Sequence, residues 1–177
     1  MGIRKRTGRL TVGAGIASIG LFTLCLGARA QDACERFAWS VAREKAWFAS
    51  SDLPVVEAGE SLAAVPSEAF SIKLKPAIEA VFELPPERRS RLDRWFGGIV
   101  RLPALNRAGI YQVTFSEDAW IDVVQNARYS RAVGSTARSD CPRIRKSVRL
   151  DLDAAPLVLQ FSGVAAEEII MAITPTQ

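Results

Sequence analysis

The chain has 177 residues, of which 49% are hydrophobic and 24% are charged, and its formal net charge is +4 at pH 7. It contains no histidine, which excludes the usual forms of Ser-His-Asp and Cys-His catalysis and the metal sites built on imidazole. The sequence also lacks a glycine-rich phosphate loop and a G-x-S-x-G nucleophile elbow.

Residues 1–30 have the three-part layout of a secretory signal peptide. A basic head precedes an uncharged, mostly apolar run over residues 10–27, and Ala28-Arg29-Ala30 then places small residues at the two positions that signal peptidase reads. We expect cleavage near Ala30, a mature chain that starts near Gln31, and a location in the periplasm or outside the cell. The alternatives are an uncleaved membrane anchor, because a helix of about 20 residues spans a bilayer, and a lipid anchor at Cys25.

Cleavage changes the charge balance of the protein. The chain has 23 Lys and Arg and 19 Asp and Glu; residues 1–30 hold five of the cations and none of the anions, which leaves 18 cations, 19 anions and a net charge of −1. Nucleic-acid binding requires a basic surface, so we expect no nucleic-acid partner. The expected partner is a protein or a glycan of the cell envelope, with no cofactor and no stable membrane insertion after cleavage.

The first element of the mature chain is predicted to be a helix over residues 31–52. Asp32 and Glu35 fit an N-cap and its capping partner, and apolar residues then recur at helical spacing. This stripe consists of Cys34, Phe37, Ala38, Val41, Ala42, Phe48 and Ala49. Trp39 and Trp47 lie off the stripe, where they form either an aromatic contact surface or a second buried face.

Cys34 and Cys141 are the two cysteines of the mature chain. An even pair in an oxidising compartment is expected to form a disulfide, which would tie the helix to a late loop. Two buried free thiols are the alternative.

Residues 53–177 are predicted to form one β-sandwich domain with the helix. Segments that alternate apolar and polar residues follow one another at hairpin spacing, and nine prolines disfavour long helices. We therefore expect a mainly β fold, a two-sheet antiparallel sandwich of the jelly-roll or immunoglobulin type, with about eight short strands. The alternating segments are 70–75, 79–84, 99–102, 111–115, 119–123, 148–153, 157–161 and 169–173.

Two regions supply candidate binding residues. Residues 87–96 form a basic loop with aromatic residues, in which Arg94 and Trp95 could meet anionic envelope polymers or lipid headgroups. The alternative is a solvated connection with Trp95 and Phe96 packed against the domain. The second region is a polar-aromatic patch on an outer sheet face, for which the alternative is cross-strand Asp–Arg pairing. Its residues are Trp120, Asp122, Arg145, Lys146 and Arg149.

Carboxylates are the groups that remain for catalysis. Asp151 and Asp153 share one face of a predicted strand, and Glu117-Asp118 and Glu167-Glu168 flank predicted turns. A pair of carboxylates can hydrolyse glycosidic bonds, and clustered acids can bind calcium. The alternative is a solvated strand face or turn, and we expect neither a catalytic residue nor a metal.

Two resemblances rest on the later part of the chain. Residues 105–116 (LNRAGIYQVTFS) and 155–163 (APLVLQFSG) resemble the strand entries of secreted bacterial β-sandwich domains found beside extracellular peptidases. The whole chain resembles a group of short exported proteins of α-proteobacteria without an established function, through residues 109–125 and 145–148. Some of that group are labelled homogentisate dioxygenase, which implies iron held by two His and a Glu, and no residue here inherits that role because the chain has no histidine.

Together these features predict an exported, non-catalytic binding or interaction module of the cell envelope. A carboxylate-dependent secreted enzyme, or an accessory domain of one, is the alternative, and a purely structural role is a third. A cavity with two carboxylates at catalytic separation would favour the enzyme. An open sheet face with exposed Trp120 or Trp95 would favour binding.

Overall fold

The computed structural model describes residues 1–2 and 33–176. Residues 3–30 of the predicted signal peptide, its cleavage site and Asp32 lie outside the described residues. The chain divides into two units, Met1–Ala30 and Gln31–Gln177, and the fold described below is that of the second unit.

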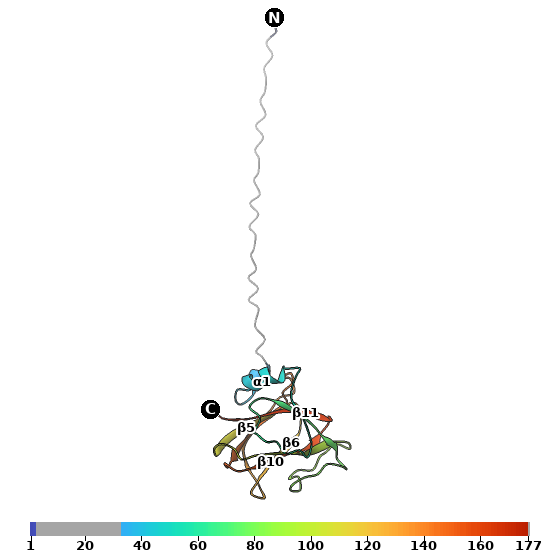
Figure 1. The fold of residues 1–177 in the computed structure, drawn as a ribbon. Helices are drawn as coiled ribbons and strands as arrows, with labels where there is room; N and C mark the ends of the chain where they lie inside the picture. Colours follow the sequence, from blue (N-terminus) through green and yellow to red (C-terminus); the bar gives the residue numbers. More distant parts are fainter. Residues whose placement is uncertain (3–32, 177) are drawn as a thin grey trace. The chain divides into compact units, whose positions relative to one another are not determined.

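The second unit is a two-sheet β-sandwich, which confirms the predicted fold class (Figure 1). The strands of sheet A are β1 Val55–Glu57, β2 Phe70–Lys73, β5 Gly109–Phe115, β8 Arg131–Ala137, β9 Lys146–Leu152 and β11 Glu168–Pro175. The strands of sheet B are β3 Lys75–Pro76, β4 Phe96–Leu102, β6 Trp120–Gln125, β7 Arg128–Tyr129 and β10 Leu157–Val164. Their spatial orders are β1-β2-β11-β5-β9-β8 and β3-β4-β10-β6-β7.

Neighbouring strands are antiparallel except for β1 and β2, which run parallel. The core lies between the sheets and is filled by alternate residues of each strand, as the period-two pattern predicted. Phe115 of sheet A and Phe161 of sheet B meet edge to face there, with ring centroids 5.7 Å apart. Both rings are fully buried, so they join the two sheets at the centre of the sandwich.

The continuous helix predicted over residues 31–52 is wrong. The segment contains a 3₁₀ turn, η1 Ala33–Arg36, and a short α-helix, α1 Ala42–Phe48, with irregular backbone between them. Two contacts bend this backbone onto sheet A: the Trp39 indole donates to Ser147 Oγ at 2.8 Å, and the Ser40 carbonyl accepts from Gln112 Nε2 at 3.2 Å. A regular helix could not present both groups to the sheet.

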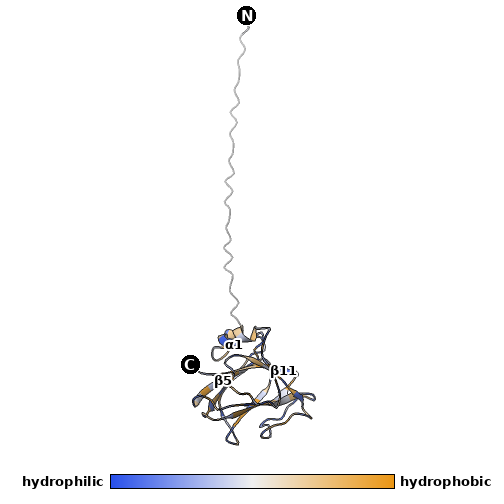
Figure 2. Cartoon of the chain, viewed as in Figure 1, coloured by the Kyte–Doolittle hydropathy of each residue, from blue (hydrophilic) through white to orange (hydrophobic). Residues whose placement is uncertain are grey.

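The N-terminal segment nevertheless buries most of the predicted stripe. Cys34, Phe37, Val41 and Phe48 are buried, whereas the alanines of the stripe are exposed. These residues form a second core with Ala69, Cys141, Ile144 and Ala172, and Trp39 and Trp47 pack against it. Figure 1 shows α1 on the outside of sheet A, away from β6 and β10, and Figure 2 shows that α1 carries both hydrophilic and apolar residues.

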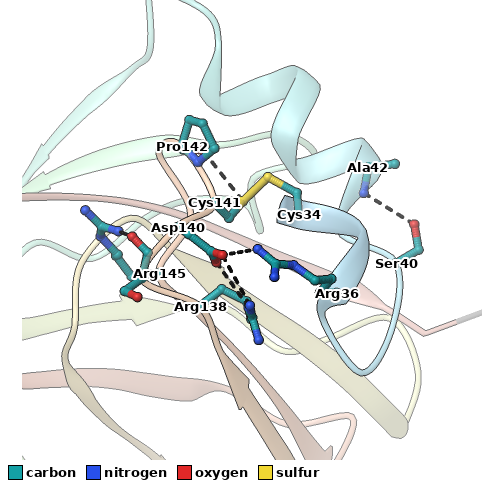
Figure 3. Close-up of a disulfide and its surroundings, with 10 residues drawn as sticks. Cys34, Arg36, Ser40, Ala42, Arg138, Asp140, Cys141, Pro142 and Arg145 are labelled. Carbon is teal, nitrogen blue, oxygen red and sulfur yellow. Dashed lines mark hydrogen bonds and ion pairs between the residues drawn. A yellow bond between two sulfur atoms is a disulfide. The ribbon is translucent and has the colours of Figure 1, made fainter. Parts of the chain in front are cut away.

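The predicted disulfide between Cys34 and Cys141 is present, with Cα atoms 4.8 Å apart. It ties η1 to the loop between β8 and β9, 107 residues further along the chain (Figure 3). Arg36 and Arg138 both point to Asp140 in the same loop. The hydrogen bond from Arg138 is the main reason that the pKa of Asp140 lies below its ordinary value.

The strand predicted over residues 79–84 is also wrong, because residues 77–95 form one irregular loop that lies on the outer face of sheet B. Gln160, on β10, points outward between the core residues Leu159 and Phe161. Its side chain accepts hydrogen bonds from the backbone N–H groups of Glu83 and Leu84. These N–H groups therefore bond to a side chain instead of a neighbouring strand.

Candidate functional site

Trp120 is the exposed aromatic residue of the predicted patch, and the structure places two cations on its ring. It lies on the outer face of sheet B with a relative exposure of 37%. The Arg88 guanidinium carbon lies 4.4 Å from the ring centroid, and Lys146 Nζ lies 4.2 Å from it. The indole is therefore engaged by cation–π contacts within the domain, which leaves less of the ring free to stack on a sugar.

Lys146 begins β9 in sheet A and reaches across to this ring from the other sheet. Its ammonium group is largely buried and donates a hydrogen bond to the Ala119 carbonyl at 2.8 Å. Burial lowers the pKa of Lys146, the Asp118 carboxylate opposes that shift, and the Arg88 charge adds to it. The predicted patch thus unites Trp120 with Lys146.

Asp122, also on β6, anchors the 77–95 loop. Its carboxylate accepts a hydrogen bond from the Glu87 N–H at 3.2 Å, and the nearby Tyr129 hydroxyl donates to the Pro85 carbonyl. Burial raises the pKa of Asp122, and the Glu87 N–H lowers it in part. Asp122 lies opposite Gln160 in sheet B, whereas Arg149 belongs to sheet A, so the cross-strand pairing of Asp122 with Arg149 does not occur.

The two candidate residues of the basic loop differ in their exposure. Trp95 is half-buried and packs against Phe82, with ring centroids 6.3 Å apart. Arg94 is exposed. Trp95 and Phe96 are thus packed, as the structural alternative for this loop stated, and Phe96 contacts the main core.

Arg145 lines a cavity that contains two of the carboxylates considered from the sequence. Glu117 and Glu168 line this space of about 350 Å³ together with Ser116, Arg143, Arg145 and Ile170. Burial raises the pKa of Glu117, and Arg145 opposes that shift. Glu168 accepts a hydrogen bond from the Ser71 hydroxyl, and Arg145 donates to the Ser139 carbonyl. The other four candidate carboxylates do not line this cavity.

Arg149 lines another cavity, which we call the arginine cavity; it lies between the N-terminal segment and the outer face of sheet A. Its lining residues are Ser40, Arg43, Glu44, Gln112, Arg149, Pro175 and Thr176, and its volume is about 180 Å³. The Arg149 guanidinium carbon lies 4.4 Å from the centroid of the Trp39 ring. Its nitrogens approach Gln112 Oε1 at 3.4 Å.

Glu44 of α1 places a carboxylate beside the arginine cavity. Only 2% of this residue is exposed. It accepts a hydrogen bond from Thr174 Oγ1 at 3.2 Å and lies 3.4 Å from an Arg43 nitrogen. Burial of a carboxylate is tolerated when hydrogen bonds and a cation compensate it, as they do here.

Arg43, Glu44 and Gln112 are candidate functional residues that the sequence pattern did not predict. In a regular helix Glu44 would lie at the edge of the apolar stripe, three residues after Val41 and four before Phe48, but a charged residue was not expected to be buried there; Gln112 occupies the outward side of a strand. The only sequence feature that indicated a site here was the pair of tryptophans, Trp39 and Trp47, in the same segment. Trp39 supports Arg149, and Arg43 lies 5.4 Å from the centroid of Trp47.

In the part of the chain that the structure describes, no three His, Cys, Asp or Glu side chains are grouped so that they could hold a metal ion. Among the same residues, none of the helices is long and apolar enough to cross a membrane.

The fold and these cavities define a small disulfide-bonded β-sandwich whose two sheets are each partly covered on the outside by irregular chain. Comparison with protein-family models, with curated proteins and with solved structures finds no match to this chain. The two resemblances drawn from the sequence therefore stay predictions.

Proposed function

We propose that the protein is an exported, non-catalytic binding module of the cell envelope, and that it binds an anionic group in the arginine cavity. The observation that carries this proposal is the charge of the cavity lining: two guanidinium groups, those of Arg43 and Arg149, against one carboxylate, that of Glu44. An anion would balance the excess positive charge, and guanidinium groups bind carboxylates with paired hydrogen bonds.

The site is held in place before any ligand arrives. Arg149 lies against Trp39, the Trp39 indole is bonded to Ser147, and the buried Ser147 hydroxyl is bonded to Thr114 at 2.9 Å. A guanidinium has five N–H donors, and the long contacts to Gln112 leave donors for an anion. Little side-chain freedom would then be lost on binding, which favours affinity.

Trp39 offers a direct test, because its indole N–H resonance reports on Arg149. In an NMR titration with acetate we expect this resonance to shift and saturate, with a dissociation constant on the order of 1 mM for so small a ligand. The shift should be lost in Arg149→Gln and retained in Arg128→Gln, which removes an exposed arginine of sheet B. A shift that does not saturate, or that persists in Arg149→Gln, would contradict the proposal.

A secreted enzyme is the second candidate, and the cavity of Glu117 and Glu168 favours it. A carboxyl group whose pKa is raised by burial can act as a general acid, and a second carboxylate beside it can act as base or nucleophile. Release of p-nitrophenol from a panel of p-nitrophenyl glycosides, abolished by Glu117→Gln, would support this candidate. Under the leading proposal we expect no turnover.

A further inference from the structure

The arginine cavity adjoins a larger apolar cavity, and Arg43 and Pro175 line both. The apolar cavity has a volume of about 550 Å³, within the range of pockets that hold small organic ligands. Most of the surface that lines it is apolar and comes from Trp47, Val65, Leu105, Tyr111 and Ile173, while Arg107 and a few uncharged polar residues also line it. The Arg43 side chain thus lies at the boundary between the polar arginine cavity and the apolar cavity.

The floor of the apolar cavity belongs to the main core. Leu105, Tyr111 and Ile173 are buried members of the cluster between the sheets, and the Tyr111 hydroxyl is already bonded to the Arg107 carbonyl at 2.9 Å. Trp47 of α1 and Val65 are half-buried beside this floor. An apolar group placed here would be removed from water on several sides, which is favourable in proportion to the apolar area covered.

The charge of the arginine cavity indicates the charge of its ligand. Glu44 lies 3.4 Å from Arg43 and balances one positive charge. The guanidinium of Arg149 remains, which corresponds to one excess positive charge in the arginine cavity; the exposed Arg107 lines the adjoining cavity. A singly charged carboxylate matches this balance better than a doubly charged phosphate.

We propose that the two cavities form one site for a carboxylic acid with an apolar body, with the carboxylate between Arg43 and Arg149 and the body against Trp47, Val65 and Leu105. This inference rests on the proposed function. The ligand chemistry is a single carboxylate joined to an apolar group, as in a fatty acid or in a peptide that ends in an apolar residue.

The test compares ligands that share the carboxylate and differ in the apolar body. In NMR titrations of the purified protein we expect octanoate to bind at least tenfold more tightly than acetate, because each buried methylene adds to affinity. Octan-1-ol, which lacks the charge, should bind at least tenfold more weakly than octanoate. Equal affinity for acetate and octanoate would overturn this inference and leave the proposed function standing, whereas binding of neither would overturn both.

Val65→Asp places a negative charge in the apolar cavity and serves as the matched variant. It should remove the advantage of octanoate over acetate while acetate still shifts the Trp39 resonance, which shows that the arginine cavity is intact. If Val65→Asp keeps the full preference for octanoate, the apolar cavity is not where the body binds, and the inference fails.

Two further ligands separate the possible sources of the carboxylate. N-acetylphenylalanine should bind more tightly than its primary amide by at least tenfold, since the amide carries no charge. Tighter binding of N-acetylphenylalanine than of octanoate supports a peptide end, and the reverse order supports an acyl chain. Equal binding of N-acetylphenylalanine and its amide would overturn the assignment of the carboxylate to the arginines.

Discussion

The side chain of Gln160 binds the backbone of Leu84 in both directions. Its Oε1 accepts from the Leu84 N–H at 2.9 Å, and its Nε2 donates to the Leu84 carbonyl at 3.2 Å. The same Oε1 accepts from the Glu83 N–H at 2.7 Å. One buried amide thus makes the pair of bonds that a neighbouring strand would make, and it fixes the 77–95 loop to sheet B.

Replacing this amide should therefore release the loop. We expect Gln160→Leu to lower the free energy of unfolding by about 1–3 kcal/mol, because buried backbone groups lose their partners. Denaturant unfolding measures the loss, and hydrogen exchange should show faster exchange at Glu83 and Leu84. Unchanged exchange at these two amides would show that the loop is held by other contacts.

The loop also shows where sequence reasoning succeeds and fails for the fold. The alternation of apolar and polar residues predicts β5 and β11 correctly. In a strand every second side chain points to the same face, so alternate apolar residues all meet the core. Residues 79–84 alternate in the same way, yet no strand lies beside them. Their partner is a side chain of β10, 76 residues away for Leu84, and no local pattern encodes a partner at that distance.

The residues of the candidate site could also be predicted only in part, because some of their partners lie far away along the chain. The local sequence predicts Lys146 and Trp120 in one polar-aromatic patch on an outer sheet face, and the structure brings them together across the two sheets. Arg149 was named as part of the same patch, but it belongs to the outer face of sheet A with Trp39. Glu44 could not be predicted, because its burial depends on Thr174, which lies 130 residues further along the chain.

The Cys34–Cys141 disulfide should contribute substantially to stability. The bridged residues are 107 positions apart, and removing a native disulfide from a small domain typically costs about 2–5 kcal/mol. We expect this loss in the double variant Cys34→Ser, Cys141→Ser, measured by guanidinium unfolding. The N-terminal segment should separate before the sheets unfold, since the seven-residue α1 is too short to persist alone.

Thiol titration provides the check on this bond. When the mature protein is unfolded without a reducing agent, no free thiol should react with a thiol reagent. Two reactive sulfhydryls per mature chain would show that the bridge is absent and that the segment is held by its buried apolar residues alone.

Lys146 should give the protein a specific pH dependence. Its folded-state pKa lies below the ordinary value of 10.5, chiefly through burial, so the folded state binds fewer protons than the unfolded state between these two values. Stability contributed by this group therefore rises as pH increases across that window. Relative to Lys146→Met, which has no such titration, wild type should become more stable as pH approaches 10.5.

Melting temperatures measured at a series of alkaline pH values test this expectation. The exposed Lys75, replaced by Met, is the matched control and should show no comparable trend. A wild-type advantage over Lys146→Met that decreases with rising pH would contradict the assigned direction of the shift.

Metal removal should have no effect on the protein. The chain lacks histidine, and the cysteines of the second unit are bonded to each other, so we expect no stoichiometric zinc or iron and no dioxygenase activity. Elemental analysis of purified protein measures the first, and melting in EDTA or in calcium chloride should give equal temperatures. One tightly bound metal per chain, or stabilisation by calcium, would contradict the prediction.

Export should yield a mature protein that begins at or near Gln31. The reason is the small-x-small pattern of Ala28-Arg29-Ala30 behind an apolar run. The intact mass of protein taken from the periplasm measures the N-terminus directly. A species that retains Met1 through Ala30 would contradict cleavage and favour the membrane anchor.

The position of β11 determines when sheet A can form. Met171 of this strand pairs with Phe70 of β2 on one side and with Phe115 of β5 on the other, so β1-β2 and β5-β9-β8 are joined only through β11. A chain that emerges from the ribosome N-terminus first cannot close this sheet until residues 168–175 have been made. If the chain is exported as we propose, sheet A is therefore still incomplete until the last residues of the chain have been synthesised.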